Sequence, residues 1–191
     1  MARRESRMLA LGTRVPAFSL PDPDGRLYGP DDFAKASALL VAFICNHCPY
    51  VKHIIGGFAD FARQYAPQGL AVVAINPNDS EAYPDDAPPA MAEVARQHRF
   101  TFPYLVDASQ KVALAYEAIC TPDFFLFDGD RRLVYRGQFD DSRPKTDVPV
   151  TGDSLRAAVD AVLAGRSVPE PQLPSVGCSI KWRPENQPDW G

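Results

Sequence analysis

Two cysteines separated by two residues, Cys45 and Cys48, are the side chains whose types and spacing could do chemistry. Two thiols at this spacing can close a disulfide and open it again, although half of a zinc site has the same spacing. They follow an apolar run, Leu39 to Ile44, which has the composition of a buried strand. Pro49 comes next, and proline is favoured in the first turn of a helix because the N–H that it lacks has no partner there. The pair is therefore predicted at a strand-to-helix junction, where the helix N-terminus stabilises a thiolate.

Other polar or thiol residues could assist this pair. His47 lies between the two cysteines and is either a stabiliser of the neighbouring thiolate or a solvated loop histidine. Cys120 is either a third redox thiol or a small buried residue, and Cys178 is either a resolving thiol or simply free. The segment 76–86 carries several carboxylates that could accept a proton from the resolving thiol, and the sequence does not distinguish among them.

Composition restricts the class of protein. The chain has 191 residues, 46% of them hydrophobic, which is enough for one sizeable core. Its net charge of −4 argues against nucleic acid or an anionic membrane as partner. No stretch approaches the roughly 20 apolar residues of a membrane span, and the apolar patch 8–11 is too short for a signal peptide. We therefore expect a cytoplasmic protein with no cofactor, whose cysteines are catalytic or metal-binding rather than structural.

Periodicity predicts an alternation of strands and helices. Strands are expected at 39–44, 70–75, 104–106, 124–127 and 133–135, and helices at 49–65, 90–100, 109–118 and 153–164. A short hairpin is expected within 14–32. This order predicts an α/β sandwich made of a leader (1–11), one domain (12–165) and a Pro-rich arm (166–191). The arm is either docked, through Ile180, Trp182 and Trp190, or loose.

Three stretches carry a resemblance to a known family. They are Val15 to Pro21 with Asp24-Gly25, Phe43 to Val51, and Thr121 to Asp128. Together they resemble the thioredoxin-like superfamily, and most closely its branch of alkyl hydroperoxide reductases, thiol-specific antioxidant proteins and redoxins. The tail Gly177 to Trp182 is similar to a subgroup described only as thioredoxin family or peroxiredoxin-like.

The resemblance implies a fold and a set of site residues. The fold is a three-layer sandwich, with a central mixed sheet flanked by helices, an N-terminal hairpin and the C-terminal arm. The resemblance also implies that Pro122 is preceded by a cis peptide bond and faces the cysteine turn, where the Thr121 backbone would offer hydrogen bonds to a docking peptide strand or a mixed disulfide. Cys45 and Cys48 are then the catalytic pair, with His47, Pro49, Thr121 and Pro122 in support and Cys120 and Cys178 as possible additional redox residues.

The attacking cysteine depends on how the motif is aligned. In thioredoxins the attacking cysteine usually comes five residues after a strand phenylalanine, and five residues after Phe43 is Cys48. Aligned in this way, the position of the second thioredoxin cysteine is Val51, and Cys45 takes the place of a peroxiredoxin threonine. The rival alignment resembles disulfide isomerases and makes Cys45 the nucleophile. We favour Cys48, because it would be the N-cap residue of the helix.

Three functions are compatible with these residues. The first is a thiol–disulfide oxidoreductase that acts on protein or small-molecule disulfides and is reduced again by an external thiol reductant. The second is a peroxidase in which Cys48 attacks a hydroperoxide, although no arginine can be assigned to a peroxidatic pocket from the sequence. The third is a non-enzymatic carrier that binds copper(I) or zinc through Cys45, His47, Cys48 and either Cys120 or Cys178. We favour the first, and expect no bound metal in it.

Overall fold

A five-stranded mixed sheet forms the centre of the computed structural model, which describes residues 3–190. The strand order is β6-β5-β4-β8-β9, in which β4, β5 and β6 are parallel and β8 is antiparallel to both of its neighbours. The strands are β4 (Ala38–Phe43), β5 (Leu70–Asn76), β6 (Tyr104–Val106), β8 (Asp123–Phe127) and β9 (Leu133–Gly137). β4, β5 and β8 are largely apolar runs, which is typical of strands that are buried on both faces.

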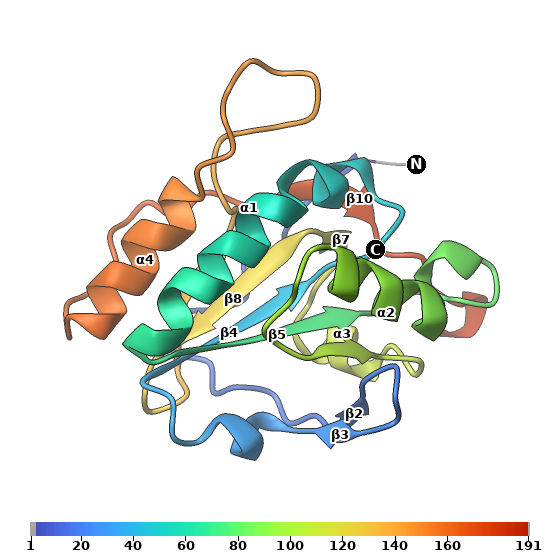
Figure 1. Cartoon of the computed structure of the whole chain (residues 1–191), viewed down its shortest axis with the longest axis horizontal. Helices are drawn as coiled ribbons and strands as arrows, with labels where there is room; N and C mark the ends of the chain where they lie inside the picture. The colour runs from blue at the N-terminus through green and yellow to red at the C-terminus, as the bar shows by residue number, and fades with distance from the viewer. Residues whose placement is uncertain (1–2, 191) are drawn as a thin grey trace.

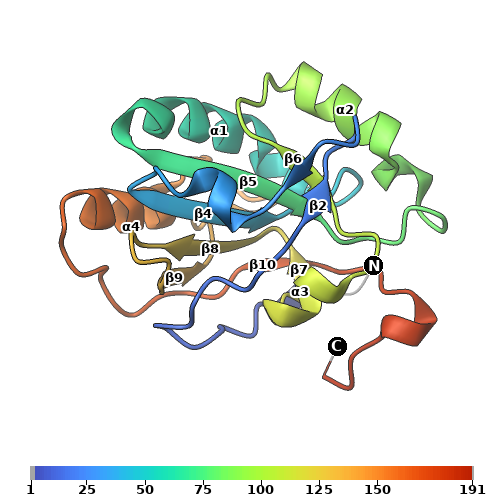
Figure 2. The ribbon, with the colours of Figure 1, turned by 90° about the horizontal axis from the view of Figure 1, so that it is seen from below.

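Helices cover both faces of this sheet (Figures 1 and 2). Along β4, Leu40 and Ala42 point into a core shared with α1 (Pro49–Tyr65) and α4 (Asp153–Leu163). Leu39, Val41 and Phe43 point into a second core that includes α3 (Lys111–Ala115). The alternation follows from the two-residue period of a strand. α2 (Pro88–Gln97) lies on the α1 side, with Met91 in the first core. The predicted thioredoxin-like three-layer sandwich is confirmed.

Local conformation explains where two helices differ from their predicted limits. α2 starts two residues early because prolines occupy its first positions, where they cost no hydrogen bond. α3 is only five residues long, since Gln110 and Glu117 on either side of it adopt left-handed backbone angles, with φ of 61° and 51°. Short 3₁₀ turns are found at Pro30–Phe33, Ala66–Gln68, Pro84–Asp86 and Pro184–Asn186.

Two small sheets complete the fold. The expected hairpin pairs β2 (Leu20–Pro21) with β3 (Leu27–Tyr28). In the other sheet β10 (Val176–Ser179) lies between β1 (Arg3–Glu5) and β7 (Cys120–Thr121). The arm is therefore docked rather than loose: Ile180 is buried, and Trp182 packs against the second core. Across residues 3–190 no helix is both long enough and apolar enough to cross a membrane.

Candidate active site

Strand register brings the predicted site residues together at one edge of the central sheet. β4 ends at Phe43, which is paired with Asp123 at the start of β8. Because β4 and β8 are antiparallel, the residues just after Phe43 lie opposite the residues just before Asp123. The cysteine turn therefore faces Thr121 and Pro122, and the peptide bond between these two residues is cis, as the resemblance implies.

Thr121 is the residue that both cysteines contact. The Sγ of Cys45 lies 3.1 Å from the Thr121 hydroxyl, and the Sγ of Cys48 lies 3.1 Å from the Thr121 carbonyl oxygen. Both sulfurs are buried, with relative exposures of 1% for Cys45 and 0% for Cys48. The two cysteines are three positions apart in one turn, and both contact the same residue. Their thiols therefore have little freedom to separate, which favours a disulfide between them.

Cys48 is the cysteine with thiolate character. It is the N-cap residue of α1, and its pKa is held well below the ordinary value, first by the Cys178 thiol, then by the Cys45 thiol and the Val51 amide, although burial opposes this. In the thiol form Cys48 can donate to the Thr121 carbonyl. In the thiolate form that carbonyl repels it, and the N-terminus of α1 stabilises the charge. A lowered pKa agrees with the position of Cys48 at a helix N-terminus.

Cys45 has the opposite electrostatic environment. Burial raises its pKa well above the ordinary value, and the hydrogen bond with Cys48 and the negative charge of Asp86 raise it further. Its Sγ, a ring nitrogen of His47 and a carboxylate oxygen of Asp86 lie within 4.8 Å of one another. The two cysteines of one turn thus differ strongly, and the pair consists of a stabilised thiolate and a thiol that resists deprotonation.

Asp86 organises the turn that carries the cysteines. Its carboxylate is 1% exposed and accepts hydrogen bonds from the Asn46 backbone amide at 2.7 Å and from the Asn78 side chain at 2.7 Å. The Nδ1 of His47 lies 2.6 Å from it, and the ring stacks on Tyr83. His47 is therefore part of a buried pair rather than a solvated loop residue. The sequence offers several carboxylates in this segment, and only the fold shows that Asp86 is the one beside the cysteines. The local feature that could have drawn attention to Asp86 is its position just before a helix that starts with two prolines.

The two remaining cysteines lie on opposite faces of the small sheet. Cys178 is paired with Thr121, and its side chain is in the same core cluster as Cys45 and Cys48. Cys120 is paired with Ser179, so its side chain lies on the other face, and its Sγ is 3.8 Å from the Pro122 carbonyl oxygen. Of the two additional candidates, the structure brings only Cys178 to the dithiol.

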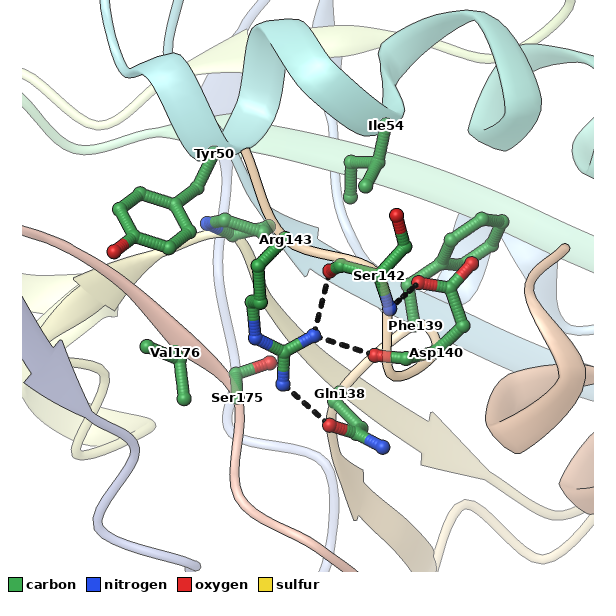
Figure 3. Close-up of a pocket in the computed structure, with 10 residues that line it drawn as sticks. Tyr50, Ile54, Gln138, Phe139, Asp140, Ser142, Arg143, Ser175 and Val176 are labelled. Carbon is green, nitrogen blue, oxygen red and sulfur yellow. Dashed lines mark hydrogen bonds between the residues drawn. The ribbon is translucent and has the colours of Figure 1, made fainter. Parts of the chain in front are cut away.

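An arginine that the sequence did not identify lies beside Pro122. Figure 3 shows Arg143 in a small hollow of about 20 Å³ that is also lined by Tyr50 and Ile54 from the first turns of α1. Its guanidinium donates to the carbonyl oxygens of Asp140 and Ser142 and to the side chain of Gln138. No sequence signal was available, because Arg143 lies in a long loop between β9 and α4 and is brought to the site by tertiary packing.

A larger cavity opens on the other side of the dithiol. It has a volume of about 270 Å³ between α1 and α2, and Cys45 and Asn46 contribute to its wall. Val51, Ile55 and Val94 make much of the wall apolar, while Lys52, Gln97 and His98 add polar groups. A small amphipathic molecule could approach Cys45 from this side.

The donor set for a metal differs from the predicted one. The structure groups Cys45 and His47 with Asp86, instead of with Cys48 and a third cysteine. The Asp86 carboxylate already accepts hydrogen bonds from Asn46 and Asn78 and pairs with His47. An ion there would have to displace these bonds, so the group is better explained as a hydrogen-bonded network.

Comparison with known proteins identifies chains that are similar to this one. The model of the AhpC/TSA family matches residues 11–136. Two Mycobacterium tuberculosis proteins, provisionally named as peroxiredoxins, are 28% identical over 110 residues, which is 58% of this chain and 65% of theirs. The chain thus matches slightly less than two thirds of the length of these relatives.

Solved structures extend the similarity to nearly the whole chain. An uncharacterised conserved protein from Geobacillus kaustophilus is 52% identical, with a TM-score of 0.94, over 96% of this chain and 98% of that one. A protein from Chlorobium tepidum, provisionally assigned as the thiol:disulfide interchange protein DsbE, is 19% identical, with a TM-score of 0.60, over 81% of this chain and 99% of that one. The second similarity concerns the fold alone.

Proposed function

The chain belongs to the AhpC/TSA family, and from this premise we propose that it is a thiol–disulfide oxidoreductase whose Cys45 and Cys48 close and open a disulfide. The observation that carries the proposal is the contact of both sulfurs with Thr121, each at 3.1 Å, at the N-terminus of α1. An exchange reaction needs one thiolate and one resolving thiol held in reach of each other. The pKa of Cys48 is lowered and that of Cys45 is raised, which supports Cys48 as the attacking thiolate and Cys45 as the resolving thiol.

In the proposed reaction, the Cys48 thiolate attacks one sulfur of a substrate disulfide and the other substrate sulfur leaves as a thiolate. Cys45 then attacks Cys48 in the mixed disulfide, which closes Cys45–Cys48 and releases the reduced substrate. Cys45 must lose a proton to attack, and its raised pKa makes this step costly. The pair of His47 and Asp86 could accept that proton, because a ring nitrogen and a carboxylate oxygen of the pair lie within 4.8 Å of the sulfur.

The experiment that tests this function maps the cysteines by alkylation and mass spectrometry across a glutathione redox series. A reversible Cys45–Cys48 disulfide, together with reduction of a small disulfide at the expense of dithiothreitol, is the expected result. Cys48→Ser should abolish turnover, whereas the double variant Cys45→Ser/Cys178→Ser, which lacks both thiols able to resolve it, should trap the mixed disulfide. Absence of the Cys45–Cys48 disulfide at every potential in the series, in the wild type and in Cys178→Ser alike, would refute the proposal.

A second candidate function, hydroperoxide reduction, is favoured by the enclosure of Cys48. Its sulfur is fully buried, and Cys48 lines neither the hollow beside Pro122 nor the cavity between α1 and α2. A small oxidant fits these limits better than a protein disulfide does, and the curated relatives carry the name of peroxiredoxins. The Cys48 thiolate would attack the peroxide, become a sulfenic acid and release an alcohol or water; a second thiol would then displace water to close a disulfide.

Peroxide consumption in the presence of dithiothreitol distinguishes the two functions. If hydroperoxide turnover exceeds turnover of small disulfides by more than about tenfold, which is about 1.4 kcal/mol in barrier, the second candidate replaces the first. A sulfenic acid trapped by dimedone at Cys48 in the double variant Cys45→Ser/Cys178→Ser would identify the intermediate.

A further inference from the structure

The C-terminal arm occupies the edge at which a substrate peptide would dock. The strand β10 pairs antiparallel with β7, so that Cys178 lies opposite Thr121 and Ser179 opposite Cys120. An extended peptide that binds by adding a strand uses such an edge through its main chain. Here a segment of the same chain takes that place, and it brings a cysteine opposite the residue that holds the dithiol.

Gly177 allows β10 to approach this closely. A Cβ at that position would lie 2.0 Å from the Thr121 carbonyl oxygen, a distance at which the strands would have to separate. Glycine is the residue that permits such an approach. On its other edge β10 is held by β1, where Gly177 is paired with Arg4. The position of Cys178 is therefore fixed from both sides.

The sulfur of Cys178 lies on the side of the sheet that carries the dithiol. Residues paired across an antiparallel ladder point to the same face, and the Thr121 side chain on that face contacts the Cys45 sulfur. Cys178 is 4% exposed and packs in the same core cluster as Cys45 and Cys48. The interaction between the Cys178 and Cys48 side chains raises the pKa of Cys178 and lowers that of Cys48.

We propose that Cys178 is the internal acceptor of the disulfide, and that the Cys45–Cys48 disulfide is passed to Cys48–Cys178 by exchange within one molecule. The inference rests on the proposed function, since it needs Cys45–Cys48 to form first. The Cys178 sulfur attacks the Cys48 sulfur, the Cys45–Cys48 bond breaks, and Cys45 leaves with the electron pair. The proton that Cys178 gives up goes to Cys45. One disulfide is lost and one is formed, so the step needs no oxidant or reductant.

This step has a consequence for the path of the electrons. Cys45 becomes a free thiol beside the cavity of about 270 Å³, while the disulfide moves to the arm. The disulfide that an external thiol reductant must then open joins the cysteine turn to the buried Cys178 of β10.

The test is a time course on the full-length protein. Reduced protein is oxidised with one equivalent of oxidised glutathione, quenched with acid at intervals, alkylated, and its disulfides are mapped by mass spectrometry. The wild-type protein should show Cys45–Cys48 first and Cys48–Cys178 later, with a rate that does not depend on protein concentration. Cys45→Ser should form only Cys48–Cys178, and Cys178→Ser only Cys45–Cys48.

Two further variants separate position from mere presence of a thiol. Gly177→Ala keeps Cys178 but moves β10 away, and should lower the yield of Cys48–Cys178 at least tenfold. Cys120→Ser is the matched control, because its thiol lies on the opposite face, and its disulfide pattern should equal that of the wild type.

The disulfide maps distinguish a failure of the inference about Cys178 from a failure of the proposed function. If Cys45–Cys48 forms but Cys48–Cys178 appears neither in the wild type nor in Cys45→Ser, the inference about Cys178 is overturned while the proposed function stands. If Cys178→Ser forms no Cys45–Cys48 disulfide, the proposed function fails, and the exchange step fails with it.

Discussion

At the scale of single residues, the charge on Cys48 depends on a thiol from the far end of the sequence. The Cys178 thiol lowers the pKa of Cys48 more than any other group does. We therefore predict that the ultraviolet absorbance of the thiolate persists well below the free cysteine pKa of about 8.5. Cys178→Ala should move the midpoint upward, because the group that lowers the pKa of Cys48 most is lost. Cys48→Ser provides the baseline, and an unmoved midpoint would contradict this role.

A second residue-scale prediction concerns Asp86. Its buried carboxylate accepts hydrogen bonds from Asn46 and Asn78, and an amide at that position cannot accept them all. Asp86→Asn should lower the free energy of unfolding by about 1–3 kcal/mol, and should lower the pKa of Cys45, since the negative charge that raises it is gone. Denaturant unfolding measures the first effect. Asp85→Asn is the control, because Asp85 is exposed, and it should change stability little.

Asp123, directly after the cis peptide bond, gives a prediction about pH. Burial raises its pKa well above the ordinary value, so the folded state holds its proton more tightly than the unfolded chain does. Its contribution to stability is complete below the unfolded pKa of about 3.9 and is lost as the pH rises toward the folded value. The stability of Asp123→Asn relative to wild type should therefore increase between about pH 4 and 8, by about 1.4 kcal/mol per unit of raised pKa.

Denaturant unfolding at several pH values tests the Asp123 prediction. Asp147→Asn serves as the comparison, because that carboxylate is exposed in the loop before α4 and should give no such slope. A flat difference for Asp123→Asn across this range would show that the carboxyl group is ionised in the folded protein.

At the scale of elements, α1 determines where Cys48 stands. Phe58 anchors this helix: it is fully buried and its ring lies 5.3–6.3 Å from the rings of Phe61, Phe102, Phe124 and Phe139. Phe58→Ala should cost about 3–5 kcal/mol of unfolding free energy, from lost burial and the cavity left behind. Lys52→Ala on the exposed side of the same helix should cost less than about 0.5 kcal/mol. Chemical denaturation of the reduced proteins checks both, and equal costs would mean that α1 is not anchored through this ring.

At the scale of the whole molecule, two segments from opposite parts of the sequence, β1 and β10, pair beside the candidate site. β1 from the leader holds one edge of β10, and β10 covers β7. The disulfide that we propose between Cys48 and Cys178 would join the start of α1 to the C-terminal arm. It would close a loop of most of the chain, whereas Cys45–Cys48 closes almost none.

Loop length predicts different stabilities for the two disulfides. In the chain-entropy model a loop of this size stabilises by about 4–5 kcal/mol. The free energy of unfolding of oxidised Cys45→Ala should exceed that of its reduced form by about this amount. Oxidised Cys178→Ala, which can form only the short loop, should gain far less. Unfolding of both variants in oxidised and reduced form measures the difference, and equal gains would contradict the long-range crosslink.

The sequence by itself determined most of the architecture and the identity of the dithiol. Hydrophobic periodicity located the strands and long helices within a few residues, since that pattern is local in the chain. The spacing of Cys45 and Cys48 before Pro49 placed them at the start of a helix for the same reason. The resemblance in the segment Thr121 to Asp128 supplied the position of Pro122.

Only the tertiary structure decided which other residues belong to the site. Asp86 was one carboxylate among several, Arg143 gave no signal, and Cys120 and Cys178 were equal candidates. Register settled the last choice: Cys178 is paired with Thr121, while Cys120 lies on the other face. Contacts between residues 73 or more positions apart in the sequence, such as that of Thr121 with Cys45, depend on how strands pair. No local pattern encodes that pairing, because it is fixed by which faces the whole chain can bury together.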